Sequence, residues 1–306
     1  MKIIFFGTPQ EVVPVLQTLI KQHNVVAVVT TPDQKSGRKQ QLTPPPVKVF
    51  AEKQGIPLLQ PEQMKTENLK LKIPQSDLIV VAAYGKIIPN EILELPKFGA
   101  INIHPSLLPK YRGPTPIQTA LLNGDETSGL TFIKMDAQMD HGPILHQLPF
   151  TLEKTDTFAW LMQSKFSQAA NVLPHVIDEY ISGKHTPQPQ DETQASYTQR
   201  ISKEDGFIDL DTPPRFEKLD RMIRAYYPWP TVWTKVRIKN QESRVKFLPS
   251  SSHPELAPLP RSRSSRRVSG SNILLQLEGK NPVSLKDFLN GYPEMRGKME
   301  DLFTNK

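Results

Sequence analysis

The chain has 306 residues, of which 37% are hydrophobic and 23% are charged, so it can bury a sizeable core and is not wholly disordered. This length predicts two domains, or one large domain with an appendage. The longest apolar run, Leu78 to Tyr84, is far shorter than the about 20 residues that span a membrane. The apolar start breaks at Gly7, too early for a secretory signal, and no cysteine is present for disulfides, thiolate metal sites or nucleophiles. We expect a cytoplasmic protein without a membrane partner.

Positive charge is concentrated in three short stretches of the chain. The formal net charge is +7. Residues 34–48, 235–246 and 257–267 each carry a net charge of +4, so the rest of the chain is acidic. Basic stretches on an otherwise acidic protein favour a polyanionic partner, although such runs are also typical of solvated loops.

The first two thirds of the chain alternate apolar strands with helices. Lys2 to Phe6 is typical of a buried strand, and Thr8 is expected to cap the following helix, which Pro14 should kink. The apolar strands are continuous rather than alternating, which indicates a sheet covered on both faces. We therefore predict an α/β fold with a Rossmann-like, mostly parallel sheet and helices on both faces. Further strands are predicted at 24–30, 77–83, 99–103, 130–135 and 144–148, and helices at 47–54 and 155–182.

The pattern changes after a predicted helix at 216–227. Short alternating strands follow at 232–238, 244–248 and 273–277, and a stretch rich in Ser, Pro and Arg covers 250–271. We place the boundary so that residues 1–205 form the larger domain and residues 206–306 form a linker and a smaller β domain.

Two polar side chains stand on a strand that is too apolar to be exposed. Asn102 and His104 are two residues apart, so they point to the same side of the sheet. Asp140 follows the next strand by a short loop, and it would lie beside His104 if the two strands are neighbours. An amide donor, an imidazole and a carboxylate can stabilise an oxyanion and move protons, which suits acyl transfer without a covalent intermediate.

Other interpretations of these residues remain open. An Asn-x-His pair on a strand is often only a structural pair. Asp140, His141 and His146 could bind a metal, but their spacing is poor ligand geometry, so we expect no metal. Gly7 follows a strand as in a dinucleotide-binding loop, but the second and third glycines of that motif are missing.

Several motifs resemble the formyltransferases that use 10-formyltetrahydrofolate, and the resemblance extends over nearly the whole chain. It implies that Asn102, His104 and Asp140 are catalytic. Asn102 and His104 would hold the oxyanion, and Asp140 would orient His104 and help to move the proton of the attacking amine. The motifs are Phe6–Pro9, Ala83–Gly85, Asn102–Gly113, Gly124–Thr131 and Met135–Gly142.

The resemblance also implies where the folate binds. A Ser-Leu-Leu-Pro tetrapeptide would lie at the tetrahydrofolate, and two loops, around 84–88 and 136–142, would contact the pterin and the rest of the folate. The implied contacts are Ser106, Leu107, Leu108, Pro109, Tyr84, Gly85, Ile87, Asp136 and Gly142.

Two further stretches resemble the branch of this family that formylates methionyl-tRNA. Residues 32–48 resemble a loop that enters the acceptor stem, which implies tRNA contacts by Lys35, Arg38 and Lys39. Residues 223–233 resemble the segment that leads into a C-terminal OB-like β-barrel. In the family this barrel binds tRNA, and its sequence is shorter in this chain. This chain also has His141 where the family usually has threonine, and Pro114-Thr115 where alanines are common.

The resemblance implies a monomeric enzyme of translation initiation that transfers a formyl group from 10-formyltetrahydrofolate to initiator methionyl-tRNA. One alternative is a formyltransferase that acts on a nucleotide-linked amino sugar or another small amine. Another is a non-catalytic RNA-binding protein on the same scaffold. The basic stretches favour tRNA over a small amine, and the intact set of Asn102, His104 and Asp140 favours catalysis.

Overall fold

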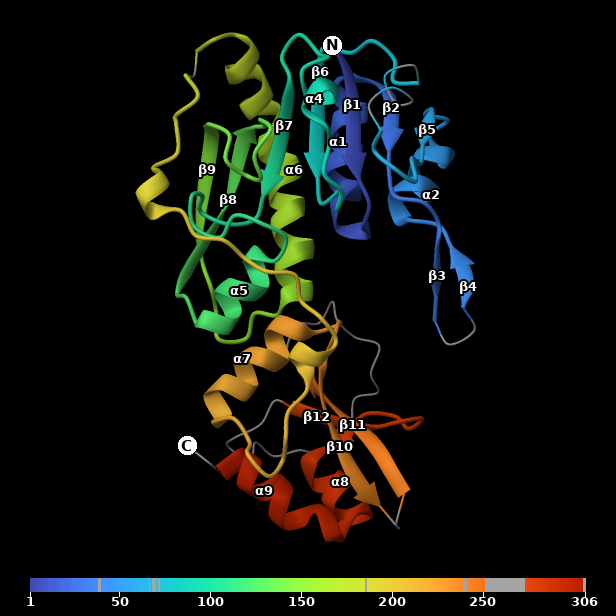
Figure 1. Ribbon diagram of the computed structural model, residues 1–306, viewed down its shortest axis with the longest axis vertical. Helices are drawn as coiled ribbons and strands as arrows, with labels where there is room; N and C mark the ends of the chain where they lie inside the picture. Colours follow the sequence, from blue (N-terminus) through green and yellow to red (C-terminus); the bar gives the residue numbers. More distant parts are fainter. Residues whose placement is uncertain are drawn as a thin grey trace. The chain divides into compact units, whose positions relative to one another are not determined.

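The computed structural model consists of two compact units (Figure 1). The first contains Met1–Pro116, Thr127–Phe150 and Met162–Gln199, and the second contains Ile117–Glu126, Thr151–Leu161 and Arg200–Lys306. The structure describes residues 1–37, 40–65, 67, 70, 72–184, 186–238, 241–250 and 273–304. In these ranges no helix is long and apolar enough to cross a membrane.

A seven-stranded sheet of order β5-β2-β1-β6-β7-β8-β9 organises the first unit. The strands from β5 to β7 are parallel, and β8 is antiparallel to β7. The predicted mostly parallel α/β sheet is thus confirmed, although the two-residue strand β5 was not anticipated. The bounds are β1 Lys2–Gly7, β2 Asn24–Val29, β5 Leu58–Leu59, β6 Leu78–Ala82, β7 Ala100–His104, β8 Thr127–Lys134 and β9 Ile144–Thr151.

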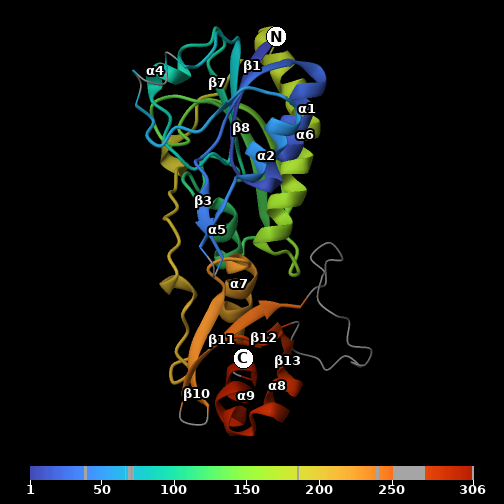
Figure 2. The same ribbon diagram turned by 90° about the vertical axis from the view of Figure 1, so that its right-hand side faces the viewer.

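The strands are continuously apolar because both faces of the sheet are covered. Ile3 and Phe5 pack in one hydrophobic core, while Ile4 and Phe6, which alternate with them, pack in another on the opposite face. Helices α1, α2 and α6 cover the first face and the short helix α4 covers the second (Figure 2). Their bounds are α1 Val13–Gln22, α2 Pro46–Lys53, α4 Asn90–Leu93 and α6 Phe158–Ile181.

The entry into the first helix differs from the prediction. A 3-10 turn, Gln10–Val12, precedes α1, and no side chain caps either element. Thr8 instead donates its hydroxyl hydrogen bond to the carbonyl of Tyr84, at 3.1 Å. Pro14 lies in the first turn of α1, where its missing N–H costs no helical hydrogen bond, so it does not interrupt the helix.

The basic stretch near residue 40 folds as a small hairpin. Strands β3 (Gln34–Ser36) and β4 (Gln41–Thr43) pair antiparallel, with Lys35 opposite Leu42. Lys35 is exposed, whereas Lys48 is 2.9 Å from the carboxylate of Asp33, which neutralises part of the stretch. The predicted tRNA contacts Arg38 and Lys39 lie outside the described residues.

The second unit is built on an antiparallel sheet of order β10-β11-β12-β13. The smaller C-terminal β structure is therefore confirmed. Two helices after β12 were not anticipated, and they bury apolar residues that include Phe288, Met299 and Leu302. The bounds are β10 Val232–Ile238, β11 Gln241–Pro249, β12 Ile273–Leu277, β13 Val283–Ser284, α5 Pro116–Asn123, α7 Phe216–Tyr226, α8 Leu285–Gly291 and α9 Arg296–Thr304.

Candidate active site

The carboxyl end of β7 carries the two predicted polar side chains. β7 lies between β6 and β8 in the sheet, so its end is surrounded by the loops of neighbouring strands. His104 is only 4% exposed and pairs in register with Thr131, and Asn102 is half-buried opposite Ile133. In open α/β sheets, ligands bind beyond the carboxyl ends of the strands, so this is the expected place for a site.

Asp140 joins these residues from the loop between β8 and β9. Its Oδ1 accepts a hydrogen bond from Asn102 Nδ2 at 3.1 Å, and its Oδ2 accepts one from the backbone N of Gly113 at 2.8 Å. Oδ2 also lies 3.5 Å from His104 Nδ1. Asp140 has φ of +50°, a left-handed conformation that Asp and Asn tolerate better than most residues. The structure therefore brings together the three residues singled out from the sequence.

The imidazole of His104 is held from the other side by a backbone carbonyl. Its Nε2 is 2.9 Å from the oxygen of Tyr111. A carbonyl can only accept, so Nε2 carries a proton in this arrangement and Nδ1 is the nitrogen that faces Asp140. Tyr111 has φ of +64°, in the left-handed region that few non-glycine residues adopt.

The Ser-Leu-Leu-Pro tetrapeptide is tied to the sheet by two residues that the sequence analysis missed. Thr131 Oγ1 accepts from the backbone N of Leu108 at 3.1 Å, and Gln147 Nε2 donates to the carbonyl of the same residue at 2.8 Å. Ser106 and Leu108 are buried, and the Ser106 hydroxyl donates to the carbonyl of Lys110. Leu107 and Pro109 are half-exposed. The buried pair therefore shapes the loop, and the half-exposed pair can reach a ligand.

The predicted pterin loop, residues 84–88, also combines buried residues with exposed ones. Tyr84 is 3% exposed, packs edge-on against Phe6, and donates its hydroxyl to Met64 Sδ at 3.2 Å. Burial raises the pKa of Tyr84 to about 12. Gly85 has φ of +82°, and Ile87 is 78% exposed. Ile87 is thus open to a ligand, whereas the Tyr84 side chain belongs to the core.

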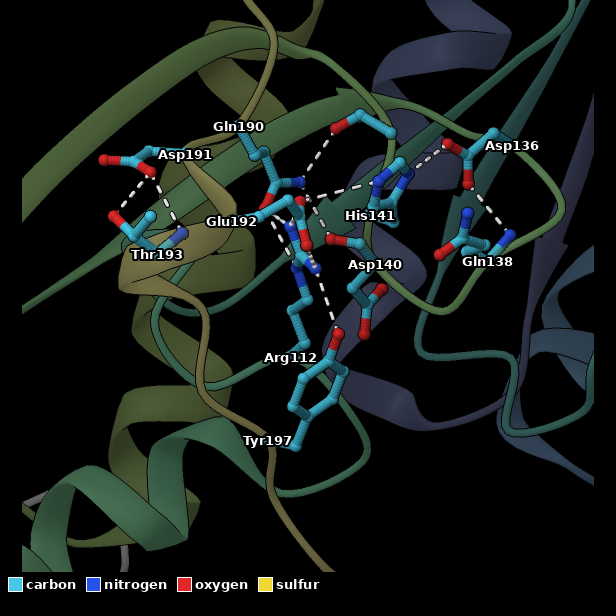
Figure 3. A network of polar contacts seen from close by, with 11 residues as sticks. Arg112, Asp136, Gln138, Asp140, His141, Gln190, Asp191, Glu192, Thr193 and Tyr197 are labelled. Atoms are coloured by element: carbon cyan, nitrogen blue, oxygen red, sulfur yellow. Dashed lines mark hydrogen bonds and ion pairs between the residues drawn. The ribbon is translucent and has the colours of Figure 1, made fainter.

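The loop of residues 136–142 is held in part by its own polar groups. Asp136 accepts from the backbone N of Gln138 at 2.9 Å and from His141 Nδ1 at 2.6 Å (Figure 3). A side chain at Gly142 would collide with the carbonyl of Lys134, so only glycine fits there. The unusual His141 therefore braces this loop internally.

A buried arginine network lies beside the loop, and the sequence analysis did not identify it (Figure 3). The Arg112 side chain is fully buried, and its guanidinium donates to Gln190, to both carboxylate oxygens of Glu192 and to the Tyr197 hydroxyl. Hydrogen bonding to Glu192 raises the pKa of Arg112, and the same contact lowers the pKa of Glu192. The only signal in the sequence was that Arg112 lies within the Asn102–Gly113 motif, which does not reveal its partners.

Within the part of the chain that the structure describes, no group of three or more His, Cys, Asp or Glu side chains is arranged to hold a metal ion.

Comparison with known proteins defines the class to which this fold and site belong. Residues 1–177 match the formyl transferase family, and residues 200–260 match the formyl transferase C-terminal domain. The chain belongs to the formyl transferase family.

Individual proteins with similar sequences are methionyl-tRNA formyltransferases. A methionyl-tRNA formyltransferase of Chloroflexus aggregans is 44% identical over 237 residues, which are 76% of each chain. One of Roseiflexus sp. is 37% identical over 302 residues, which are 95% of this chain and 92% of that protein.

Solved structures share the fold at lower identity. A methionyl-tRNA formyltransferase from Clostridium thermocellum has a TM-score of 0.59 at 19% identity, covering 93% of this chain and 99% of that one. A sugar N-formyltransferase from Shewanella sp. has a TM-score of 0.60 at 18% identity, covering 79% and 95%. At these identities the likeness concerns the fold alone.

Proposed function

We propose that the chain transfers the formyl group of 10-formyltetrahydrofolate to the amino group of methionyl-tRNA. The observation that carries this proposal is the grouping of Asn102, His104 and Asp140 at the carboxyl end of β7 in a chain that resembles methionyl-tRNA formyltransferases over most of its length. The initiator tRNA is the proposed acceptor, and translation initiation in the cytoplasm is the proposed role of a monomeric enzyme.

Asn102 and His104 are proposed to stabilise the oxyanion that forms on the formyl carbon. The Asn102 amide has two N–H groups, and only one is used by Asp140, so the other remains for the developing charge. Because His104 Nε2 donates to the Tyr111 carbonyl, His104 can donate from Nδ1 to a substrate oxygen only as the imidazolium. Nδ1 lies 3.5 Å from Asp140, beyond ordinary hydrogen-bond distance, so that carboxylate does not occupy it. Loss of one such donor typically costs about 10²–10³ in rate.

Asp140 is proposed to orient His104 and to move the proton of the attacking amine, directly or through water, to the leaving nitrogen of the folate as the bond between that nitrogen and the formyl carbon breaks. An α-amino group has a pKa of about 7.7–8.0, and only its neutral form is a nucleophile. At neutral pH much of the amine must therefore lose a proton, and a carboxylate beside the reacting centre gives that proton a place to go.

The binding roles follow the exposed parts of the site. Folate is proposed to contact Leu107, Pro109 and Ile87 by their side chains, and Gly85 and Asp136 where their loops approach it. Gly142 is buried, so it is proposed to shape its loop. Ser106, Leu108 and Tyr84 are proposed to shape these loops from below, because they are buried.

The tRNA is proposed to contact Lys35 in strand β3 and Arg38 and Lys39, which lie outside the described residues. Basic residues of strands β10 and β11 in the second unit are proposed to contact it as well. We assign catalysis of the transfer to residues 1–205 and tRNA binding to residues 206–306.

The test is a formylation assay with three acceptors side by side: initiator methionyl-tRNA, elongator methionyl-tRNA and a nucleotide-linked amino sugar. We expect formylmethionine from the initiator tRNA, dependent on added 10-formyltetrahydrofolate, and none from a His104→Ala variant. Formylation of the amino sugar alone would show that the acceptor is wrong. No formylation of any acceptor would favour a non-catalytic RNA-binding protein.

A further inference from the structure

We propose that Gln190 is a positioning residue for Asp140. The inference rests on the proposed function, because it assigns Gln190 to the geometry of the proposed catalytic carboxylate. In sequence, Gln190 lies in a proline- and glutamine-rich segment between α6 and the second unit, with no motif around it.

The Gln190 side-chain amide holds two backbone carbonyl groups, those of Asp140 and Gly142. Nε2 donates to the carbonyl of Asp140 at 2.8 Å and to the carbonyl of Gly142 at 2.8 Å (Figure 3). These two bonds use both N–H groups of the amide. Because Asp140 has φ of +50°, its backbone needs such support to stay in a sparsely populated conformation.

The other end of the same amide is fixed by the buried arginine. Gln190 Oε1 accepts from Arg112 Nε at 3.1 Å and from Arg112 Nη2 at 2.8 Å. The amide cannot be flipped, since an oxygen would then face two carbonyls and an NH₂ group would face the guanidinium. The Gln190 side chain therefore has one orientation, and its amide makes all four of the hydrogen bonds that it can make.

This arrangement couples the two loops that make the site. The neighbours of Arg112 in the chain are Tyr111, whose carbonyl holds His104, and Gly113, whose amide holds Asp140. Arg112 is itself bound between backbone partners, because its N donates to the carbonyl of Ser196 and its carbonyl accepts from the N of Thr198. Gln190 thus connects the backbone of Asp140 to the loop that holds both His104 and the Asp140 carboxylate.

The substitution Gln190→Glu keeps the hydrogen bonds of the side-chain oxygen to Arg112 and removes those of Nε2 to the two carbonyls. A carboxylate keeps the shape and strengthens the bond to Arg112, but it places an oxygen against the carbonyls of Asp140 and Gly142. Gln188→Glu is the matched control, because Gln188 is exposed in the same segment and its side chain donates only one such bond, to the carbonyl of Thr186.

Each substitution is made in the parent and in an Asp140→Asn background, and single-turnover formylation is measured at saturating 10-formyltetrahydrofolate and methionyl-tRNA. We expect Gln190→Glu to slow the parent by tenfold or more, to slow Asp140→Asn by less than twofold, and to leave the melting temperature close to that of Gln188→Glu. A residue that only stabilises the fold would slow both backgrounds equally. Coupling of fivefold or more between the two substitutions supports the inference, and weaker coupling overturns it.

Two further measurements keep the test decisive. If Gln190→Glu does not fold, Gln190→Asn, which keeps the amide and shortens its reach, is judged by the same coupling. If Asp140→Asn retains formylation, the proposed role of Asp140 fails, and amide hydrogen exchange then decides whether Gln190 holds the loop. Faster exchange across residues 136–142 in Gln190→Glu than in Gln188→Glu supports that contact, and equal exchange refutes it.

Discussion

The carboxylate of Asp140 accepts a hydrogen bond from the backbone amide of Gly113, with 2.8 Å between Oδ2 and N. Asp140 follows β8 and Gly113 follows β7, so this bond closes one loop of the site on the other. The same oxygen is 3.5 Å from His104 Nδ1. The position of the carboxylate relative to the imidazole is therefore set by the backbone of the neighbouring loop.

Asp140→Asn should lower kcat by about 10²-fold or more, within the range typical of a lost general acid or base. The asparagine amide has a single acceptor oxygen, so it cannot accept from both Asn102 and Gly113, and it carries no negative charge toward His104. Asn tolerates the φ of +50° as Asp does, so the melting temperature should change little. The control is Asp77→Asn, which removes a carboxylate that accepts from the backbone N of Lys2. Parental turnover by Asp140→Asn would contradict the proposed role.

Glu192→Gln should remove part of the acid sensitivity of the fold. The pKa of Glu192 is lowered by Arg112, so this carboxylate stabilises the folded state fully above its unfolded pKa of about 4.3 and less as the pH falls below it. We expect the melting temperature of the parent to fall more steeply than that of Glu192→Gln as the pH is lowered through this range. Glu52→Gln, an exposed position on α2, serves as control. Parallel curves for parent and Glu192→Gln would show that the pair does not contribute.

Gly142→Ala should destabilise the first unit by about 1–3 kcal/mol, the usual cost of forcing extra volume into a packed site. The new methyl group would collide with the backbone carbonyl of Lys134, which cannot rotate away as a side chain can. Gly291→Ala is the matched control, because nothing lies within 4 Å of its added Cβ. Chemical unfolding of both variants checks the difference, and equal stabilities would mean that the loop yields without cost.

Arg237→Glu should weaken tRNA binding in a salt-dependent manner. In the register of β10 and β11, Lys235 lies opposite Arg244, and Arg237 lies two residues further along the same face. Removing a contact to a phosphate reduces the slope of log Kd against log salt by about one. Filter binding at several salt concentrations measures it, with Lys286→Glu on α8 as control. An unchanged slope would mean that Arg237 does not face the RNA backbone.

Arg38→Lys should lower formylation tenfold or more at subsaturating tRNA, since a good bidentate contact is worth about 1–3 kcal/mol. A guanidinium can bridge phosphates or stack on a base, and lysine does this poorly. Arg38 lies outside the described residues, between strands β3 and β4. The neighbouring swap Lys35→Arg, which also conserves charge, should have little effect. Equal rates for Arg38→Lys and the parent would mean that Arg38 contributes only its charge to attracting the tRNA.

Much of the fold was predictable because it depends on local patterns of apolar and polar residues. Continuous apolar runs in β1, β6 and β7 predicted a sheet covered on both faces, and the spacing of Asn102 and His104 placed them on one side of a strand. The start of α1 was predicted wrongly, because the Thr8 hydroxyl bonds Tyr84, 76 residues away, rather than a helix amide. Helices α8 and α9 were missed because their short apolar patterns are ambiguous.

The sequence by itself determined the kind of sheet and the identity of Asn102, His104 and Asp140 as candidates, since side-chain alternation and loop position are local properties. Only the tertiary structure decided which groups hold them. Gln190 and Glu192 reach Arg112 across 78 and 80 residues, and Thr131 and Gln147 meet the Leu108 backbone from two other strands. These partners depend on how the strands are ordered and on how loops pack over their ends. A buried guanidinium must find hydrogen-bond acceptors, but no local pattern states which ones.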